Sequence, residues 1–370
     1  MGRVPLRKDA GTSAVLARLS LGRTGSGSIW NAAEPGLLPG PLDQRVLGHL
    51  NPRYRLGGRQ VRSMLAHYLP RFYLAGFTSA EVPVGQEPFV FFYDLAEGRW
   101  RRRSPANLAR IPDYYAIEDS TGRRHQDIEA AFAVVEDRMA DLLRRKIVLR
   151  EELSVTDRVR IAEFVALLFL RVPVQQAIIA DQLQRIGEEN ARRLYHFVRE
   201  EPARLDEIKR EIQRTTGVEI TPDFSVDDLD PDQYTVEPTR NAVIVQGFRL
   251  LDTLVPHLAA MGWGISFAPK GSSFVTSDAP VFLHADRGTS DSRPVAFTDE
   301  DVQITCALSS SLALYATPKI ERLEYKEVTA SAVEQINIRT AARAETIIIA
   351  NSEKPSGYPG LLQVLGRSTS

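Results

Sequence analysis

Cysteine is almost absent from this sequence, because Cys306 is the only one in 370 residues. One thiol cannot form an internal disulfide, and no spacing of cysteine and histidine resembles a zinc site. The sequence also lacks a Walker loop and the GxGxxG, HExxH and GxSxG patterns, each of which builds a known phosphate, metal or nucleophile site. These absences argue against the disulfide-stabilised secreted class, and we expect neither a metal nor another cofactor.

Long hydrophobic runs are also missing. The longest, FVALLFL at residues 164–170, is bounded by Glu163 and Arg171. It falls far short of the roughly 20 residues that a helix needs to cross a bilayer. The first residues hold only short apolar pieces, so we expect no secretory signal. The sequence therefore predicts a cytoplasmic protein without a membrane partner.

The formal net charge of -1 predicts neither nucleic-acid nor membrane binding, but the charge is unevenly distributed. Residues 1–63 contain ten Arg or Lys and three acids, a charge of +7, so the remainder carries -8. Frequent Gly, Pro and Ser residues predict that residues 1–63 form a disordered basic leader. It is either a solvated tail or the result of a start codon assigned too far upstream; a nucleic-acid arm or a transit peptide is the alternative.

The remaining pattern predicts an α+β fold. An aromatic run from Phe89 and the arginines after it predict a β-hairpin, and a helical middle of three to four long helices follows. After Gly262 the period changes to that of a mostly antiparallel C-terminal sheet. The expected helices are 127–150, 157–171 with a cap at Ser154 or Thr156, 174–201, 240–261 and 330–343.

Two short motifs bracket this body. The run HYLPRFYLAGF begins at His67, FVTSDAPV contains Ser277 and Asp278, and Arg171 ends the most apolar helix. In this order they resemble the domain of unknown function 4238 family, a bacterial group with His-Tyr-x-Pro and Ser-Asp-x-Pro motifs, over about residues 64–350. The resemblance implies a single domain over 64–352 that starts at Met64, and a flexible tail over 353–370. It implies no reaction. Some relatives are encoded beside mobile-element or phage-defence genes, which points toward an effector.

The motifs carry the candidate chemistry. His67 titrates near neutrality and is the expected general base, with Asp278 to orient it, and Arg71 offers a fixed cation for phosphate or carboxylate. The residues expected to bind the substrate are Tyr68, Arg71, Tyr73, Arg171 and Ser277.

A structural explanation stands beside each assignment. Asp278 would cap the turn at Ala279 and Pro280, and His67 with Tyr68 would form a satisfied polar cluster. Arg171 would bond the carbonyls at its own helix end.

Two weaker patterns remain. Glu324, Tyr325 and Lys326 have the Glu-x-Lys form of some nuclease sites, and residues 100–103, WRRR, suit a nucleic acid but also an ordinary exposed hairpin. The leading interpretation is an intracellular effector that hydrolyses or binds a nucleotide or nucleic acid. The alternative is a non-enzymatic interaction or sensor protein that uses the same pocket for a partner or small ligand.

Overall fold

The structure, a computed structural model of the whole chain, describes residues 65–83, 85–118, 124–125, 127–216, 220, 223–287, 294–319 and 323–366. The predicted leader at 1–63 and the predicted start at Met64 lie outside this part. The described residues form two compact units, one within 176–246 and the other within 65–175 and 247–366. The span expected as one domain is thus divided. The mixture of helices and mostly antiparallel strands confirms the α+β class.

The larger unit contains a five-stranded sheet in the order β12-β7-β11-β10-β9. Its central strand pair is buried along almost its whole length, as expected of continuous apolar runs. Neighbouring strands are antiparallel except β12 with β7, which are parallel. The strands are β7 (Gly262–Phe267), β9 (Val281–Ala285), β10 (Val302–Ser309), β11 (Leu312–Thr317) and β12 (Glu324–Glu327).

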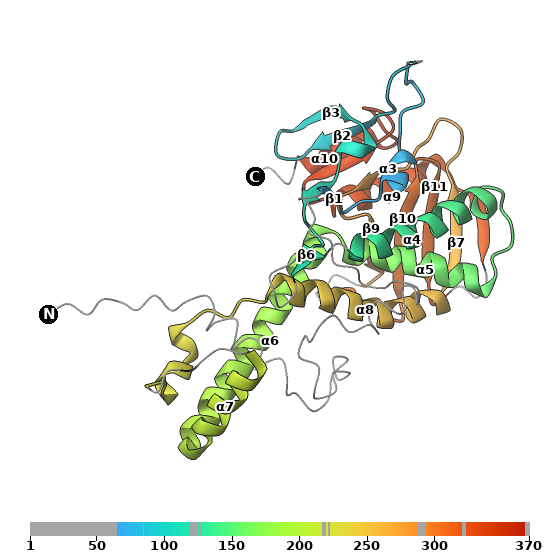
Figure 1. Cartoon of the computed structure of the whole chain (residues 1–370). Helices are drawn as coiled ribbons and strands as arrows, with labels where there is room; N and C mark the ends of the chain where they lie inside the picture. Colours follow the sequence, from blue (N-terminus) through green and yellow to red (C-terminus); the bar gives the residue numbers. More distant parts are fainter. Residues whose placement is uncertain are drawn as a thin grey trace. The chain divides into compact units, whose positions relative to one another are not determined.

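A second, four-stranded sheet has the order β3-β2-β13-β8, so β3 lies at one edge (Figure 1). The predicted hairpin is confirmed as β2 with β3, and its turn closes through Gly98 at φ 65 and through Asp94, which accepts hydrogen bonds from two turn amides. The strands are β2 (Val90–Asp94), β3 (Arg99–Arg103), β8 (Thr276–Ser277) and β13 (Ile347–Ala350). Two short antiparallel pairs complete the strands: β1 (Leu65–His67) with β4 (Arg110–Pro112), and β5 (Ile117–Glu118) with β6 (Arg124–His125).

The helices of the larger unit follow the predicted stripes. The buried face of α4 (Asp127–Leu142) holds Ile128, Phe132 and Val135, and the helix continues as a π-helical turn at Leu143–Ile147. In α5 (Val155–Leu170), Ser154 supplies the predicted cap as part of a capping box with Asp157. The remaining helices are α3 (Arg71–Ala75), the C-terminal part of α8 (Arg240–Ala260), α9 (Ala330–Ala341) and α10 (Tyr358–Leu365), with a 3-10 turn at Pro105–Asn107.

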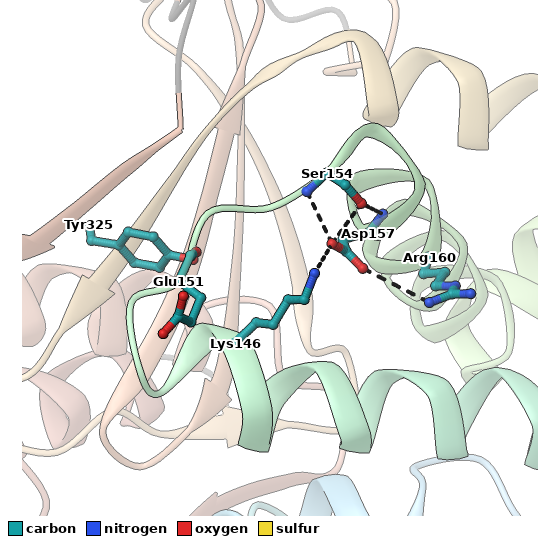
Figure 2. Close-up of polar contacts among 6 residues, drawn as sticks. All are labelled: Lys146, Glu151, Ser154, Asp157, Arg160 and Tyr325. Atoms are coloured by element: carbon teal, nitrogen blue, oxygen red, sulfur yellow. Dashed lines mark hydrogen bonds and ion pairs between the residues drawn. The ribbon is translucent and has the colours of Figure 1, made fainter.

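The connection between α4 and α5 is tied down by polar contacts (Figure 2). The buried carboxylate of Asp157 accepts hydrogen bonds from Lys146 Nζ at 2.5 Å and from the amide of Ser154 at 3.0 Å. The hydroxyl of Tyr325, on edge strand β12, donates to the main-chain carbonyl of Glu151 at 2.6 Å. Tyr325 therefore anchors this turn to the sheet, while its neighbours Glu324 and Lys326 are exposed.

The smaller unit is built mainly of helices. It contains most of α6 (Pro173–Glu200), α7 (Leu205–Thr216) and short 3-10 turns at Pro202–Arg204, Val226–Leu229 and Pro231–Gln233. Its buried clusters are small: Val198 packs with Leu229, and Ala191 packs with Val236. Helix α7, half of whose residues are charged, was not predicted from the sequence.

The C-terminal segment differs from the prediction of a flexible tail over 353–370. Residues 358–365 form α10, and its Leu361 and Leu365 are buried against β13 and α9. Two leucines four residues apart share a helix face, and that face completes the apolar cluster. Within the part of the chain that the structure describes, no single helix is long and apolar enough to cross a membrane.

Candidate functional site

The first motif runs from β1 into the short helix α3. Strand β1 pairs with β4, which places His67 opposite Arg110, and the amide of Tyr68 donates to the carbonyl of Ala109 at 2.9 Å. Pro70 then precedes α3 with φ -56, an angle that its ring fixes. Local pairing and this proline thus hold the His67 backbone between two elements.

The imidazole of His67 is half-buried, and its Nε2 lies 3.1 Å from the carbonyl oxygen of Ala106. A carbonyl can only accept, so this contact assigns the proton to Nε2 and leaves the lone pair of the neutral ring on Nδ1. Burial lowers the pKa of His67 below 6.5, and the positive charges of Arg71, Arg110 and Arg171 lower it further, against the hydrogen bond to Ala106. The ring is therefore neutral at neutral pH, the form that a general base requires.

Two of these cations are open to solvent. Arg71, at the start of α3, and Arg110, at the start of β4, are both exposed. Neither forms an ion pair with another described residue. They can therefore receive an anion beside His67, as the first motif predicted for Arg71.

Arg171 is different, because its side chain is only 2% exposed. Its Nη1 donates to Glu136 Oε1 at 2.6 Å, its Nη2 donates to the main-chain carbonyl of His67, and its guanidinium lies 4.5 Å from the Phe132 ring centroid. The carbonyls of its own helix end are not its partners, so the structural explanation from the sequence named the wrong acceptors. With these contacts made, Arg171 holds the motif backbone and is not presented to a bound anion.

A carboxyl group that no sequence motif pointed to, that of Glu129, lies in the electrostatic field of Arg171. Glu129 lies on α4, seven residues before Glu136 and therefore on the same helix face. Burial raises the pKa of Glu129, Arg171 opposes this shift, and Glu136 adds to it. Its Oε1 is buried without a hydrogen-bond partner among the described residues. Burial without a hydrogen-bond partner thus favours the protonated form of this carboxyl group.

The second motif has a largely structural geometry. Asp278 is buried, and its carboxylate accepts from the amide of Glu345 at 3.0 Å, from the amide of Thr346 at 2.7 Å and from the Thr346 hydroxyl. Its neighbour Ser277 caps the following turn, with Oγ accepting from the amide of Ala279 at 3.1 Å. The predicted turn cap therefore exists, but Ser277 supplies it. Asp278 binds the chain ahead of β13 and does not orient His67.

The two motifs nevertheless meet through tyrosines. The hydroxyl of Tyr73 lies 2.7 Å from Thr276 Oγ1 and donates to the Ala307 carbonyl at 2.8 Å. Burial raises the pKa of Tyr68, as does the negative charge of Asp278, and a hydrogen bond to the Thr346 side chain opposes the shift. Tyr68 of the first motif thus lies in the electrostatic field of Asp278 of the second.

The two tyrosines also mark the side of the motif that faces the core. Tyr73 is buried among aromatic rings, 5.4 Å from Phe77 and 6.2 Å from Phe164 between centroids. Burial raises the pKa of Tyr73. Neither its hydroxyl nor the buried Ser277 is open to a ligand, so the binding roles predicted for these two residues do not fit this arrangement.

Among the residues that the structure describes, no cluster of three His, Cys, Asp or Glu side chains could hold a metal ion. The polar groups of the site that remain to bind a ligand or to transfer a proton are the His67 imidazole, the two exposed guanidiniums and the Glu129 carboxyl.

Comparisons with known proteins identify the family and nothing finer. A family model described as "Protein of unknown function (DUF4238)" matches residues 66–354. The match includes both motifs and the helix between them. No curated protein and no solved structure matches the chain.

Proposed function

We propose a function for this chain from the premise that it belongs to the DUF4238 family of proteins of unknown function. The proposed function is that of an effector-type hydrolase that acts on the phosphate group of a nucleotide or nucleic acid. The observation that carries the proposal is the neutral His67 imidazole beside Arg71 and Arg110. A neutral base among cations suits a substrate that brings its own negative charge.

The proposed reaction uses two proton transfers. Nδ1 of His67 takes a proton from a water molecule whose oxygen attacks the phosphorus atom, while Arg71 and Arg110 hold the phosphate oxygens. The bond from phosphorus to the leaving oxygen breaks, and that oxygen receives the proton of the Glu129 carboxyl. The raised pKa of Glu129 supports its role as the donor, because the group must be protonated before it can act as an acid.

The roles of the remaining motif residues are positional in this proposal. Arg171 fixes the His67 backbone, and Ala106 fixes the proton on its ring. A cytoplasmic location is part of the proposal and is supported by the single thiol of Cys306, which is buried. A role in phage defence or on mobile elements remains a prediction from the resemblance.

A non-enzymatic binder or sensor is the second candidate, and one observation favours it. Asp278 uses both carboxylate oxygens in main-chain and hydroxyl bonds, so His67 has no carboxylate from the second motif to stabilise its imidazolium. A site of this kind would bind an anion without turning it over.

The experiment is a hydrolysis assay on the full chain with nucleoside triphosphates and with oligonucleotides, with and without added magnesium. We expect turnover that falls by about 10²–10⁴ in both His67→Ala and Glu129→Gln. The matched control is His257→Ala, which removes an exposed imidazole from α8. Full turnover in His67→Ala would exclude the proposed base. Binding of a nucleotide without turnover in the wild type would establish the second candidate.

A further inference from the structure

Strand β3 contains a run of arginines, and the segment that follows it in the chain contacts His67. Its sequence is RWRRR, and the chain passes from Arg103 through the 3-10 turn at Pro105–Asn107 into β4, where Arg110 stands opposite His67. The carbonyl that accepts from the His67 ring belongs to Ala106 within that turn. One continuous segment therefore includes both the arginines of edge strand β3, labelled in Figure 1, and the residues 106 and 110 that lie beside His67.

The arginines of β3 fall into two groups. Arg99 and Arg101 both pair with Glu97, in the hairpin turn. Arg102 and Arg103 are exposed and form no ion pair with a described residue. Within the described part of the chain no acid neutralises their charges, and they can attract an anion at the end of the strand nearest the turn at Pro105–Asn107.

Aromatic rings hold these two guanidinium groups in place. Arg102 lies 4.9 Å from the ring centroid of Phe91 and 5.1 Å from that of Phe89, and Arg103 lies 5.4 Å from that of Phe92. A guanidinium that is already ordered loses less conformational entropy when it binds a phosphate or stacks on a base. The planes of Arg102 and Arg103 are thus partly preorganised for a ligand.

We propose that the substrate is a single-stranded nucleic acid laid along β3. This inference rests on the proposed function and specifies its substrate. Arg102 and Arg103 bind the phosphates on one side of the reacting group, and Arg110 and Arg71 hold the phosphodiester that is attacked by the water molecule from which His67 takes a proton. A mononucleotide carries all its phosphates in one short chain on a single nucleoside and has none to place along β3, so the arginine segment favours a polymer.

The strand's shape and its stacked guanidiniums indicate single strands. Successive side chains of a strand point to opposite faces of the sheet, so Arg102 and Arg103 lie on either side of the edge along which a single phosphate backbone can run. In a duplex the bases stack on each other, whereas in a single strand their faces are free to stack on a guanidinium. Charged residues on an edge strand also prevent pairing with another sheet, and that role alone would require no ligand.

The test is fluorescence anisotropy with oligothymidylate and oligouridylate of about 20 nucleotides, using the full chain with His67→Ala to prevent turnover. We expect Arg102→Gln/Arg103→Gln to raise Kd about tenfold or more. We expect the slope of log K against log salt to become shallower by about 1.4, or about 0.7 for each lost contact. Tighter binding of oligothymidylate would indicate a DNA substrate, and tighter binding of oligouridylate would indicate an RNA substrate.

The matched control is Arg185→Gln/Arg193→Gln, which removes the same charge from exposed positions on α6. A thermal melt of each variant verifies folding. The salt dependence of oligonucleotide affinity in the parent protein is a second measurement, and it needs no substitution on β3. An equal loss of affinity in both double variants, a flat salt dependence, or equal affinity for a duplex would each overturn the inference.

The two proposals can fail separately. Turnover of mononucleotides with no oligonucleotide binding would leave the hydrolase standing and exclude the β3 path. Oligonucleotide binding that depends on Arg102 and Arg103, without turnover by the wild type, would establish the path and exclude the hydrolase.

Discussion

Arg171 donates a hydrogen bond from Nη2 to the main-chain carbonyl of His67, 104 residues earlier in the chain. The same guanidinium pairs with Glu136 on α4. Three segments that are distant in sequence therefore converge on one buried cation. Because that cation also lowers the pKa of His67, the group that positions the motif helps to keep its imidazole neutral.

Replacing Arg171 with methionine should destabilise the fold strongly. The change leaves the Glu136 carboxylate without its partner and removes the donor to His67, which for a buried pair costs about 3–5 kcal/mol. Urea unfolding measures the loss. Arg185→Met, at an exposed ion pair on α6, should change the free energy of unfolding by less than about 0.5 kcal/mol. Equal stability of the two variants would show that Arg171 is not a structural anchor.

The titration of His67 should respond to its neighbouring arginines. In the wild type, NMR of the imidazole should show a midpoint below 6.5, because burial and three guanidiniums disfavour the imidazolium. Arg71→Ala and Arg110→Ala should each move this midpoint upward, whereas Arg185→Ala should not. If His67 is the base, kcat/KM should fall as the pH drops through the same midpoint. A midpoint above 6.5 would contradict the proposed neutral base.

Glu129→Gln should make the protein more stable at neutral pH while it removes the proposed acid. The pKa of Glu129 is raised on folding, so the wild type loses stability as the pH rises from 4.5 through the folded-state value. The variant avoids that loss, by on the order of 1 kcal/mol or about 2–4 °C in Tm. Below pH 4.5 the carboxyl is neutral in both states, and the gain should vanish. Thermal melts across this range provide the measurement; a gain that persists at low pH would exclude ionisation as its cause.

Asp278→Asn should act on stability rather than on chemistry. Its amide nitrogen cannot accept a hydrogen bond, so at least one donor from Glu345 or Thr346 loses its acceptor, and we expect a cost of about 2–3 kcal/mol. Ser277→Ala, which loses one bond to Ala279, should cost about 1 kcal/mol. Differential scanning calorimetry compares them. An Asp278→Asn protein that melts like the wild type yet lacks activity would return Asp278 to the catalytic group.

The sequence alone determined most of the secondary structure, because its signals are local. The apolar stripe of α4, the capping box at Ser154 and the run 164–170 each follow from spacing within one segment. The hairpin of β2 and β3 has the same origin, since the aromatic strand β2 is followed by a turn that Asp94 and Gly98 favour. Two helices that escaped prediction, α7 and α10, are short, with 12 and 8 residues.

The partners of the motif residues were decided only by the tertiary structure. The pattern around Asp278 predicts a turn cap, but its acceptor oxygens are taken by residues 67 and 68 positions away, which β13 brings to the end of β8. In the same way, helical spacing places Glu129 and Glu136 on one face, yet it cannot show that a guanidinium from α5 lies against that face. Secondary-structure propensity depends on residues that are neighbours in the sequence. The burial and the charges that set the pKa of His67 and Glu129 depend instead on which distant segments pack together.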